Sequence, residues 1–150
     1  MQMFRNDALT VAFMSWAAAQ LIKIVTDVVK QKKVNLSLIL SSGGMPSSHS
    51  SFVVSVATYV GYANGFDSYI FAVAAVLAIV VMYDAAGVRR AAGKQAAAIN
   101  ALLEKENPEL NEAEKFNELL GHKPIEVFFG AILGFIIASG IYYYRIVGGN

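Results

Sequence analysis

Four apolar stretches organise the chain, and each approaches the length at which a helix can cross a bilayer. They cover about residues 8–29, 50–63, 69–88 and 125–146. A transmembrane helix takes about 20 predominantly apolar residues, which the third stretch meets best and the second meets only with the polar residues before it. Lys23 and Asp27 interrupt the end of the first stretch, so it does not read as a cleaved signal peptide. The pattern predicts an all-α fold, an integral membrane bundle of about four transmembrane helices.

The segment from about residue 91 to 121 has a different composition, rich in Ala, Lys, Glu and Asn. It predicts two short surface helices, about 92–106 and 112–120, separated by the helix-breaking pair Asn107-Pro108. No repeat, low-complexity tract or linker interrupts the chain. We therefore expect a single domain over residues 1–150 with a surface helical insertion at about 91–121.

Composition supports the membrane assignment and narrows the chemistry. The chain is 56% hydrophobic and 15% charged, with a mean hydropathy of +0.50. Soluble domains average roughly 45–50% apolar residues and about 25% charged residues. A net charge of +1 does not indicate nucleic-acid binding. The absence of cysteine excludes disulfides, thiolate metal sites and a Cys nucleophile. Imidazole chemistry has only His49 and His122 to use.

Polar residues gather where the apolar stretches end or begin. In an up-and-down bundle, the ends of the first and third stretches and the starts of the second and fourth meet at one membrane face. The residues concerned are Lys23, Asp27, Lys30, Ser47, Ser48, His49, Asp84, Arg89, Arg90, His122 and Glu126. Ten Lys and Arg residues fall on this side and two on the other. The positive-inside rule then predicts a site on the cytoplasmic face of the plasma (inner) membrane, with both termini outside.

The string Gly-Gly-Met-Pro-Ser-Ser-His-Ser over residues 43–50 is a candidate phosphate site. Gly43 and Gly44 allow close approach of the backbone, and the serines after Pro46 suit a helix start, whose free N–H groups bind anions. His49 would lie in the first turn, where it could donate a proton to a leaving group. The alternative is a tight turn that only caps a helix.

Cations flank this string. Lys23 and Lys30 are seven residues apart and share a helix face, although Lys23 could instead pair with Asp27 or snorkel to the interface. Arg89 and Arg90 could bind phosphate oxygens bidentately or serve as an ordinary membrane anchor. Asp84 could orient one of these cations or neutralise an arginine.

The second histidine heads the fourth stretch. Glu126, four residues after His122, could hydrogen-bond the imidazole and leave the other ring nitrogen free to attack phosphorus. The alternative is a solvated histidine beside a glutamate favoured by the helix dipole. No carboxylate cluster or histidine triad suggests a metal site, and we expect no cofactor.

These residues resemble the pattern of the type 2 phosphatidic acid phosphatase (PAP2) superfamily, specifically its divergent small membrane branch. The superfamily pattern is Lys-x6-Arg-Pro, then Pro-Ser-Gly-His, then Ser-Arg-x5-His-x3-Asp. Here the parts read Lys23-x6-Lys30, Pro46-Ser47-Ser48-His49, and an arginine at 89 or 90 followed more than thirty residues later by His122-x3-Glu126. The resemblance covers nearly the whole chain.

The resemblance implies roles for these residues. His122 would be the nucleophile oriented by Glu126, and His49 would protonate the leaving alkoxide. Lys23, Ser47, Ser48 and an arginine would hold the phosphate.

The leading hypothesis is a metal-independent phosphatase that acts on a lipid phosphate monoester of the phosphatidylglycerophosphate or phosphatidic acid class. The alternatives are a catalytically degenerate lipid-phosphate binder and a small transporter, although a transporter would need polar residues at mid-membrane. The expected partners are the lipid substrate and the bilayer. The small-residue stripe Gly130, Gly134 and Ala138 favours a close helix contact, either within the chain or across a homodimer.

Overall fold

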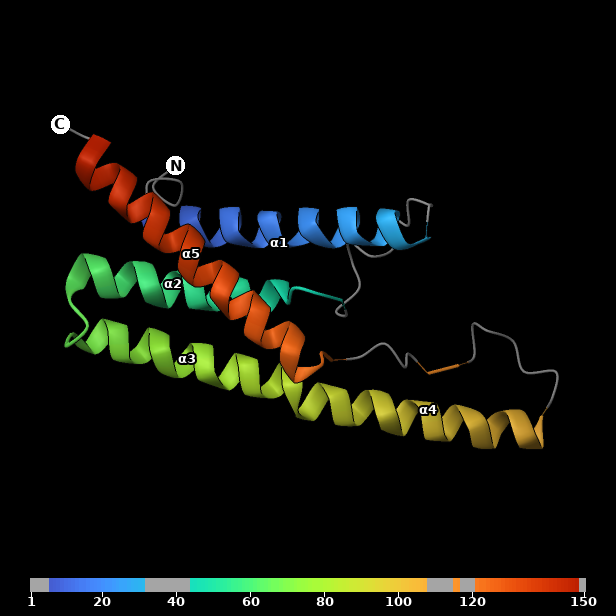
Figure 1. Ribbon diagram of the computed structural model, residues 1–150. Coiled ribbons are helices and arrows are strands. Elements are labelled where there is room, and N and C mark those ends of the chain that lie inside the picture. The colour runs from blue at the N-terminus through green and yellow to red at the C-terminus, as the bar shows by residue number, and fades with distance from the viewer. Residues whose placement is uncertain (1–5, 32–43, 108–114, 117–120, 149–150) are drawn as a thin grey trace.

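The computed structural model describes residues 6–31, 44–107, 115–116 and 121–148, and every regular element in these ranges is helical (Figure 1). The helices are α1 (Asp7–Gln31), α2 (Ser48–Asn64), α3 (Tyr69–Ala86), α4 (Val88–Glu106) and α5 (Pro124–Gly148). Within the described residues, three helical runs are long and apolar enough to cross a membrane, namely Asp7–Val29, Tyr69–Glu106 and Pro124–Ile146. The predicted all-α membrane bundle is confirmed.

Helix α2 is the short central member of the bundle. Its 17 residues rise about 25 Å, a little less than the hydrocarbon core of about 30 Å. It packs against α1, α3 and α5, which lets it bury small polar residues, among them Ser50, Ser51 and Ser55. The hydroxyls of Ser15 on α1 and Ser51 lie 2.6 Å apart, and each also donates to the other's backbone carbonyl. Hydroxyl pairing of this kind joins helices where no water competes.

The small-residue stripe on α5 packs within the chain. A Cβ at Gly130 would overlap the Ser47 carbonyl oxygen, and one at Gly134 would overlap that of Ser51. Ala138, one turn further on, is fully buried against Val11 and Tyr59. The absence of side chains at the two glycines therefore lets α5 cross α2 at backbone contact.

Helix α3 passes into α4 at Gly87, where the backbone departs from helical geometry and the Gly87 N–H bonds the Tyr83 carbonyl. The first predicted surface helix is confirmed as helical, but it begins at Val88 and continues nearly in the direction of α3 (Figure 1). The second, at about 112–120, falls almost wholly outside the described residues. Lys115 and Phe116 are described and are not helical.

Two contacts hold the described part of this return segment against α4. The Asn100 side chain exchanges two hydrogen bonds of 2.9 Å with the Phe116 backbone, and Lys115 pairs with Glu104 at 2.8 Å.

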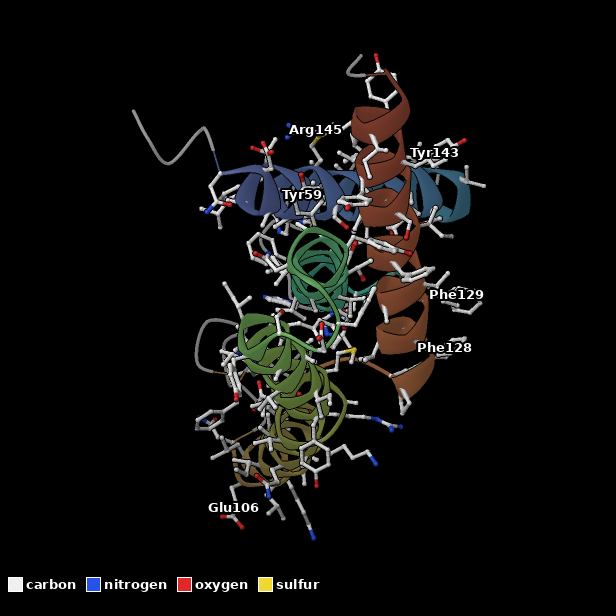
Figure 2. All side chains as sticks on the ribbon, turned by 90° about the vertical axis from the view of Figure 1, so that its left-hand side faces the viewer. Tyr59, Glu106, Phe128, Phe129, Tyr143 and Arg145 are labelled. Atoms are coloured by element: carbon white, nitrogen blue, oxygen red, sulfur yellow. The ribbon has the colours of Figure 1, made fainter. Side chains whose placement is uncertain are left out.

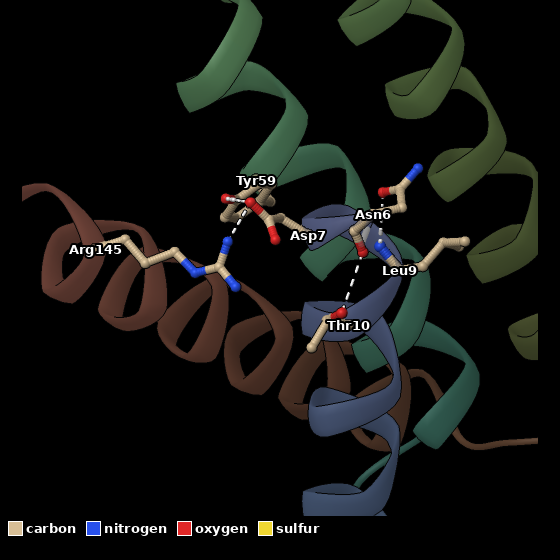
Figure 3. A network of polar contacts seen from close by, with 6 residues as sticks. All are labelled: Asn6, Asp7, Leu9, Thr10, Tyr59 and Arg145. Carbon is tan, nitrogen blue, oxygen red and sulfur yellow. Dashed lines mark hydrogen bonds and ion pairs between the residues drawn. The ribbon is translucent and has the colours of Figure 1, made fainter. Parts of the chain in front are cut away.

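Polar contacts join three helices at the end of the bundle opposite the predicted site. Asp7 at the start of α1 pairs with Arg145 near the end of α5, and the Tyr59 hydroxyl on α2 donates to the same carboxylate over 3.3 Å (Figure 3). Nearby, Tyr62 and Tyr142 stack with ring centroids 5.0 Å apart. The first turn of α1 and the last turns of α5 therefore lie at one end of the bundle.

Gly134→Ala should destabilise the protein, because the added methyl group meets the Ser51 backbone, which cannot move without shifting α2. Overpacking typically costs about 1–3 kcal/mol. Gly140→Ala is the matched control on the same helix, since nothing lies within 4 Å of its Cβ position. It should be neutral or stabilise by up to about 1 kcal/mol. Thermal unfolding in detergent measures both, and equal melting temperatures for the two variants would contradict the internal α2–α5 contact.

Candidate functional site

Three chain segments meet at the other end of the bundle, namely the start of α2, the end of α3 and the start of α5 (Figure 1), and Lys23 of α1 lies beside the start of α2. Two backbone hydrogen bonds of 2.9 Å join them. The Ser47 N–H bonds the Glu126 carbonyl, and the His122 N–H bonds the Ala85 carbonyl. The polar residues predicted from sequence to share one membrane face are thereby brought to one end of the fold.

The two histidines of the chain face each other at this end. Their ring centroids are 6.2 Å apart and their planes meet at 79°. His49 is exposed in the first turn of α2, whereas His122, just before α5, is 2% exposed. The two imidazole rings are therefore close neighbours in an edge-to-face arrangement.

His122 is held by its backbone and leaves its ring free. Gly121 adopts a φ of +84°, and a Cβ there would overlap the backbone of Arg90, so only glycine fits the approach. Neither ring nitrogen of His122 has a hydrogen-bond partner among the described residues. Burial is the main cause that lowers the pKa of His122 from 6.5 to about 4, and the nearby basic groups Lys23, His49 and Arg89 act in the same direction. His122 is therefore neutral near pH 7, the form in which imidazole acts as a nucleophile.

Lys23 brings a buried ammonium group to the start of α2. Its side chain is 4% exposed, and Nζ donates to the Ser48 hydroxyl over 3.4 Å. Gly44 lies over its aliphatic stem, with the Cβ position 3.8 Å from Cδ. A buried cation beside the N-terminus of a helix attracts an anion, because both present positive charge to the same space.

Of the two arginines, Arg89 is the one whose charge contributes to lowering the pKa of His122. Asp84 on α3 accepts a hydrogen bond of 2.6 Å from its Nε across the Gly87 bend. The Arg89 side chain stays half exposed, so the remaining guanidinium nitrogens can reach a ligand. Arg90 contributes its backbone, on which Gly121 packs.

Two predicted site residues have structural partners instead. Ser47 is fully buried as the N-cap of α2, and its hydroxyl accepts from the Ser50 backbone N–H and hydroxyl, which leaves it turned into the helix. The expected hydrogen bond in which the His122 ring donates to the Glu126 carboxylate is not formed. The Glu126 carboxylate instead accepts from the Lys123 N–H at 3.0 Å and caps the first turn of α5, the local geometry that an N3 glutamate favours.

The other predicted positions are placed only in part. Asp27 lies one turn beyond Lys23 on α1 and is half-buried. Lys30 is in the last turn of α1, but its side chain lies outside the described part of the structure, as does Gly43 altogether. Among the described residues, no group of three His, Cys, Asp or Glu side chains could hold a metal ion.

Sequence reasoning missed a groove of about 400 Å³ between α1 and α5, which adjoins Lys23. Its α5 wall is Phe129, Ile132, Leu133 and Ile136. Their spacing of i, i+3, i+4 and i+7 marks one helix face, but it does not tell a groove from a packed or lipid-facing stripe.

An all-α membrane bundle with two neighbouring histidines and several cations at one end defines an integral membrane protein with a polar site at that end. The comparisons agree with this class. A family model described as "Divergent PAP2 family" matches residues 4–137, and the chain belongs to this family. It is also similar to "Uncharacterized membrane protein YuiD" of Bacillus subtilis (strain 168), with 40% identity over 156 residues, 96% of this chain and 99% of that protein. No solved structure matches the chain.

Lowering the pH from 6.5 toward 4 should destabilise the folded protein through His122. In this window the unfolded chain binds the proton and the folded chain does not, because the folded pKa is about 4. Stability therefore falls as pH falls, by up to about 1.4 kcal/mol per pH unit, and the contribution of His122 fades within about one pH unit above 6.5. Thermal unfolding in detergent across this range should show a shallower dependence for His122→Asn than for the wild type. Identical pH dependences would rule out a buried, neutral His122.

Proposed function

We propose that this protein is a lipid phosphate phosphatase that works through a phosphohistidine intermediate on His122. The observation that carries the proposal is the facing pair of histidines, one buried and neutral with free ring nitrogens, the other exposed at a helix N-terminus. Membership of the divergent PAP2 family supports the same chemistry. A monoester is the proposed substrate class because its phosphate carries up to two negative charges, which the nearby cationic groups can pair with.

The reaction divides into two steps. A ring nitrogen of neutral His122 attacks the phosphorus, the P–O bond to the alcohol breaks, and His49 as imidazolium donates its proton to the leaving alkoxide. Neutral His49 then takes a proton from water, the resulting hydroxide attacks the phosphohistidine, and inorganic phosphate leaves with the His122 ring restored.

Positive charge around the histidines stabilises the transferring phosphoryl group. The Lys23 ammonium and the N–H groups at the start of α2 approach from one side, and the half-exposed Arg89 guanidinium supplies the other cation. Ser48 shares the phosphate with Lys23 through its hydroxyl. The substrate is a phosphoryl monoester of a membrane lipid, of the phosphatidylglycerophosphate or phosphatidic acid class.

The test is phosphate release from a panel of lipid phosphates in detergent with EDTA present. Wild type should cleave at least one lipid, and His122→Asn should lose at least about 10³-fold in rate, because the nucleophile is removed. His49→Asn should lose about 10²–10⁴-fold, the usual contribution of a general acid–base group. Acid-labile radioactive phosphate should be trapped on wild type and not on His122→Asn.

Arg89→Gln and Arg90→Gln form a matched pair in the same assay, with the first expected to lose activity and the second to keep most of it.

If folded wild type binds lipid phosphates and cleaves none, a catalytically degenerate lipid-phosphate binder becomes the better assignment. The missing Glu126–His122 hydrogen bond favours this second function, because nothing described then fixes the tautomer of the nucleophile.

We also propose that the site faces the cytoplasm of a plasma (inner) membrane. The cysteine-free chain allows single-cysteine labelling, and two exposed positions lie at opposite ends of the bundle: Glu106 at the end of α4 and Asp67 between α2 and α3. A membrane-impermeant maleimide should label Asp67→Cys in intact cells and Glu106→Cys only in inverted vesicles. The reverse pattern would place the site outside.

A further inference from the structure

The groove between α1 and α5 begins where the anion site ends. Lys23 and the segment Gly44–Pro46 line the groove. The same Lys23 carries its ammonium group to Ser48 at the start of α2. A molecule in the groove therefore has its polar end beside the phosphate-binding groups, although the two histidines themselves lie outside the groove.

The walls of the groove are mostly apolar, with Thr26 and Asp27 of α1 as polar members beside Lys23, and they open to the side of the bundle. Phe129 is 41% and Ile136 59% exposed on α5, and Ile22 on α1 is 39% exposed. These positions belong to the spans of α1 and α5 that cross the membrane, so the surface they expose faces hydrocarbon. Figure 2 shows Phe128 and Phe129 projecting from α5 away from α3 and α4. The groove is accordingly reached from the bilayer, whereas His49 is exposed at the end of the bundle.

Size and shape suit a hydrocarbon chain. The volume of about 400 Å³ is within the range of small-molecule sites, roughly 300–1,000 Å³. The α5 wall extends from Phe129 to Ile136, which is about 10 Å along the helix axis. Apolar walls this long cover the part of a lipid tail nearest the head group.

We propose that this groove binds the hydrocarbon tail of the phosphate-bearing lipid, which enters sideways from the bilayer and places its phosphate at Lys23. The inference rests on the proposed function for the identity of the head group. Asp27 also lines the groove, but Lys23 is the charged group that reaches the start of α2 at Ser48. Its ammonium group and the N-terminus of α2 together favour a phosphate monoester, which carries more negative charge than the diester of an ordinary membrane lipid.

A binding experiment tests the groove without requiring turnover. In a Trp16→Phe, His122→Asn background, which removes the single native tryptophan and prevents hydrolysis, Phe129→Trp places a fluorophore in the groove. Phe135→Trp is the matched control, since Phe135 is exposed on α5 but does not line the groove. The probes are phosphatidic acid and phosphatidylglycerol with brominated acyl chains, each diluted in unbrominated phosphatidylcholine vesicles.

Brominated phosphatidic acid should quench Phe129→Trp at least about threefold more than brominated phosphatidylglycerol, and both lipids should quench Phe135→Trp equally. Adding Lys23→Met should abolish the preference at Phe129→Trp. Equal quenching by the two lipids at Phe129→Trp would mean that the groove holds bulk lipid only, which overturns the proposal. A preference that persists in Lys23→Met would overturn it as well.

A kinetic arm separates this proposal from the proposed function. Ile132→Trp fills the groove, so KM for a long-chain lipid phosphate should rise about tenfold while hydrolysis of water-soluble p-nitrophenyl phosphate stays unchanged. An equal loss on both substrates, or no loss on either, counts against the groove while leaving the phosphatase intact. If wild type hydrolyses neither substrate, the phosphatase fails, and the quenching experiment still decides whether the groove binds the tail.

Discussion

The close backbone contact between α2 and α5 is the constraint on which the site depends. Gly130 and Gly134 lie against the carbonyl oxygens of Ser47 and Ser51, and the Ser47 N–H bonds the Glu126 carbonyl. Helices in a membrane gain little from hydrophobic burial against each other, so close van der Waals contact and hydrogen bonds set their positions. Because α5 meets α2 at its first turn, the residues just before α5 fall beside the residues that begin α2. The facing histidines are a direct consequence.

The site combines burial with basic groups placed close to His122. His122 is neutral because it is buried and surrounded by basic groups, and Lys23 is buried beside a hydroxyl. Such an arrangement is costly without an anion and becomes favourable with one, since opposite charges interact strongly where water is excluded. The groove can hold the apolar part of a lipid, because Lys23 lies where the polar site meets the apolar walls. A phosphate attached to a hydrocarbon tail complements both halves.

The long separation between the arginines and the second histidine is closed by two local contacts. Helix α4 leaves the bundle after Gly87, and the chain returns to the same place, where Gly121 packs on the Arg90 backbone and the His122 N–H bonds the Ala85 carbonyl. More than thirty residues therefore separate Arg90 and His122 in sequence without separating them in space. The long intervening segment therefore leaves Arg90 and His122 close together in the fold.

Sequence alone is enough to predict the apolar helices and α4, the end of the bundle that carries the polar residues, and the position of each histidine at the start of a helix. These follow from local hydropathy and from N-terminal signals such as Pro46 and Ser47, which act within a few residues. The fold was needed to show that Glu126 caps α5 instead of meeting His122 and that the glycine stripe of α5 meets α2. It was also needed to show that the Arg89 charge lowers the pKa of His122. Each of these outcomes depends on the rotation and crossing of helices distant in sequence. An apolar helix face has the same sequence pattern whether it packs on another helix, contacts lipid or lines a groove. Only the position of a second helix in the fold distinguishes these three cases.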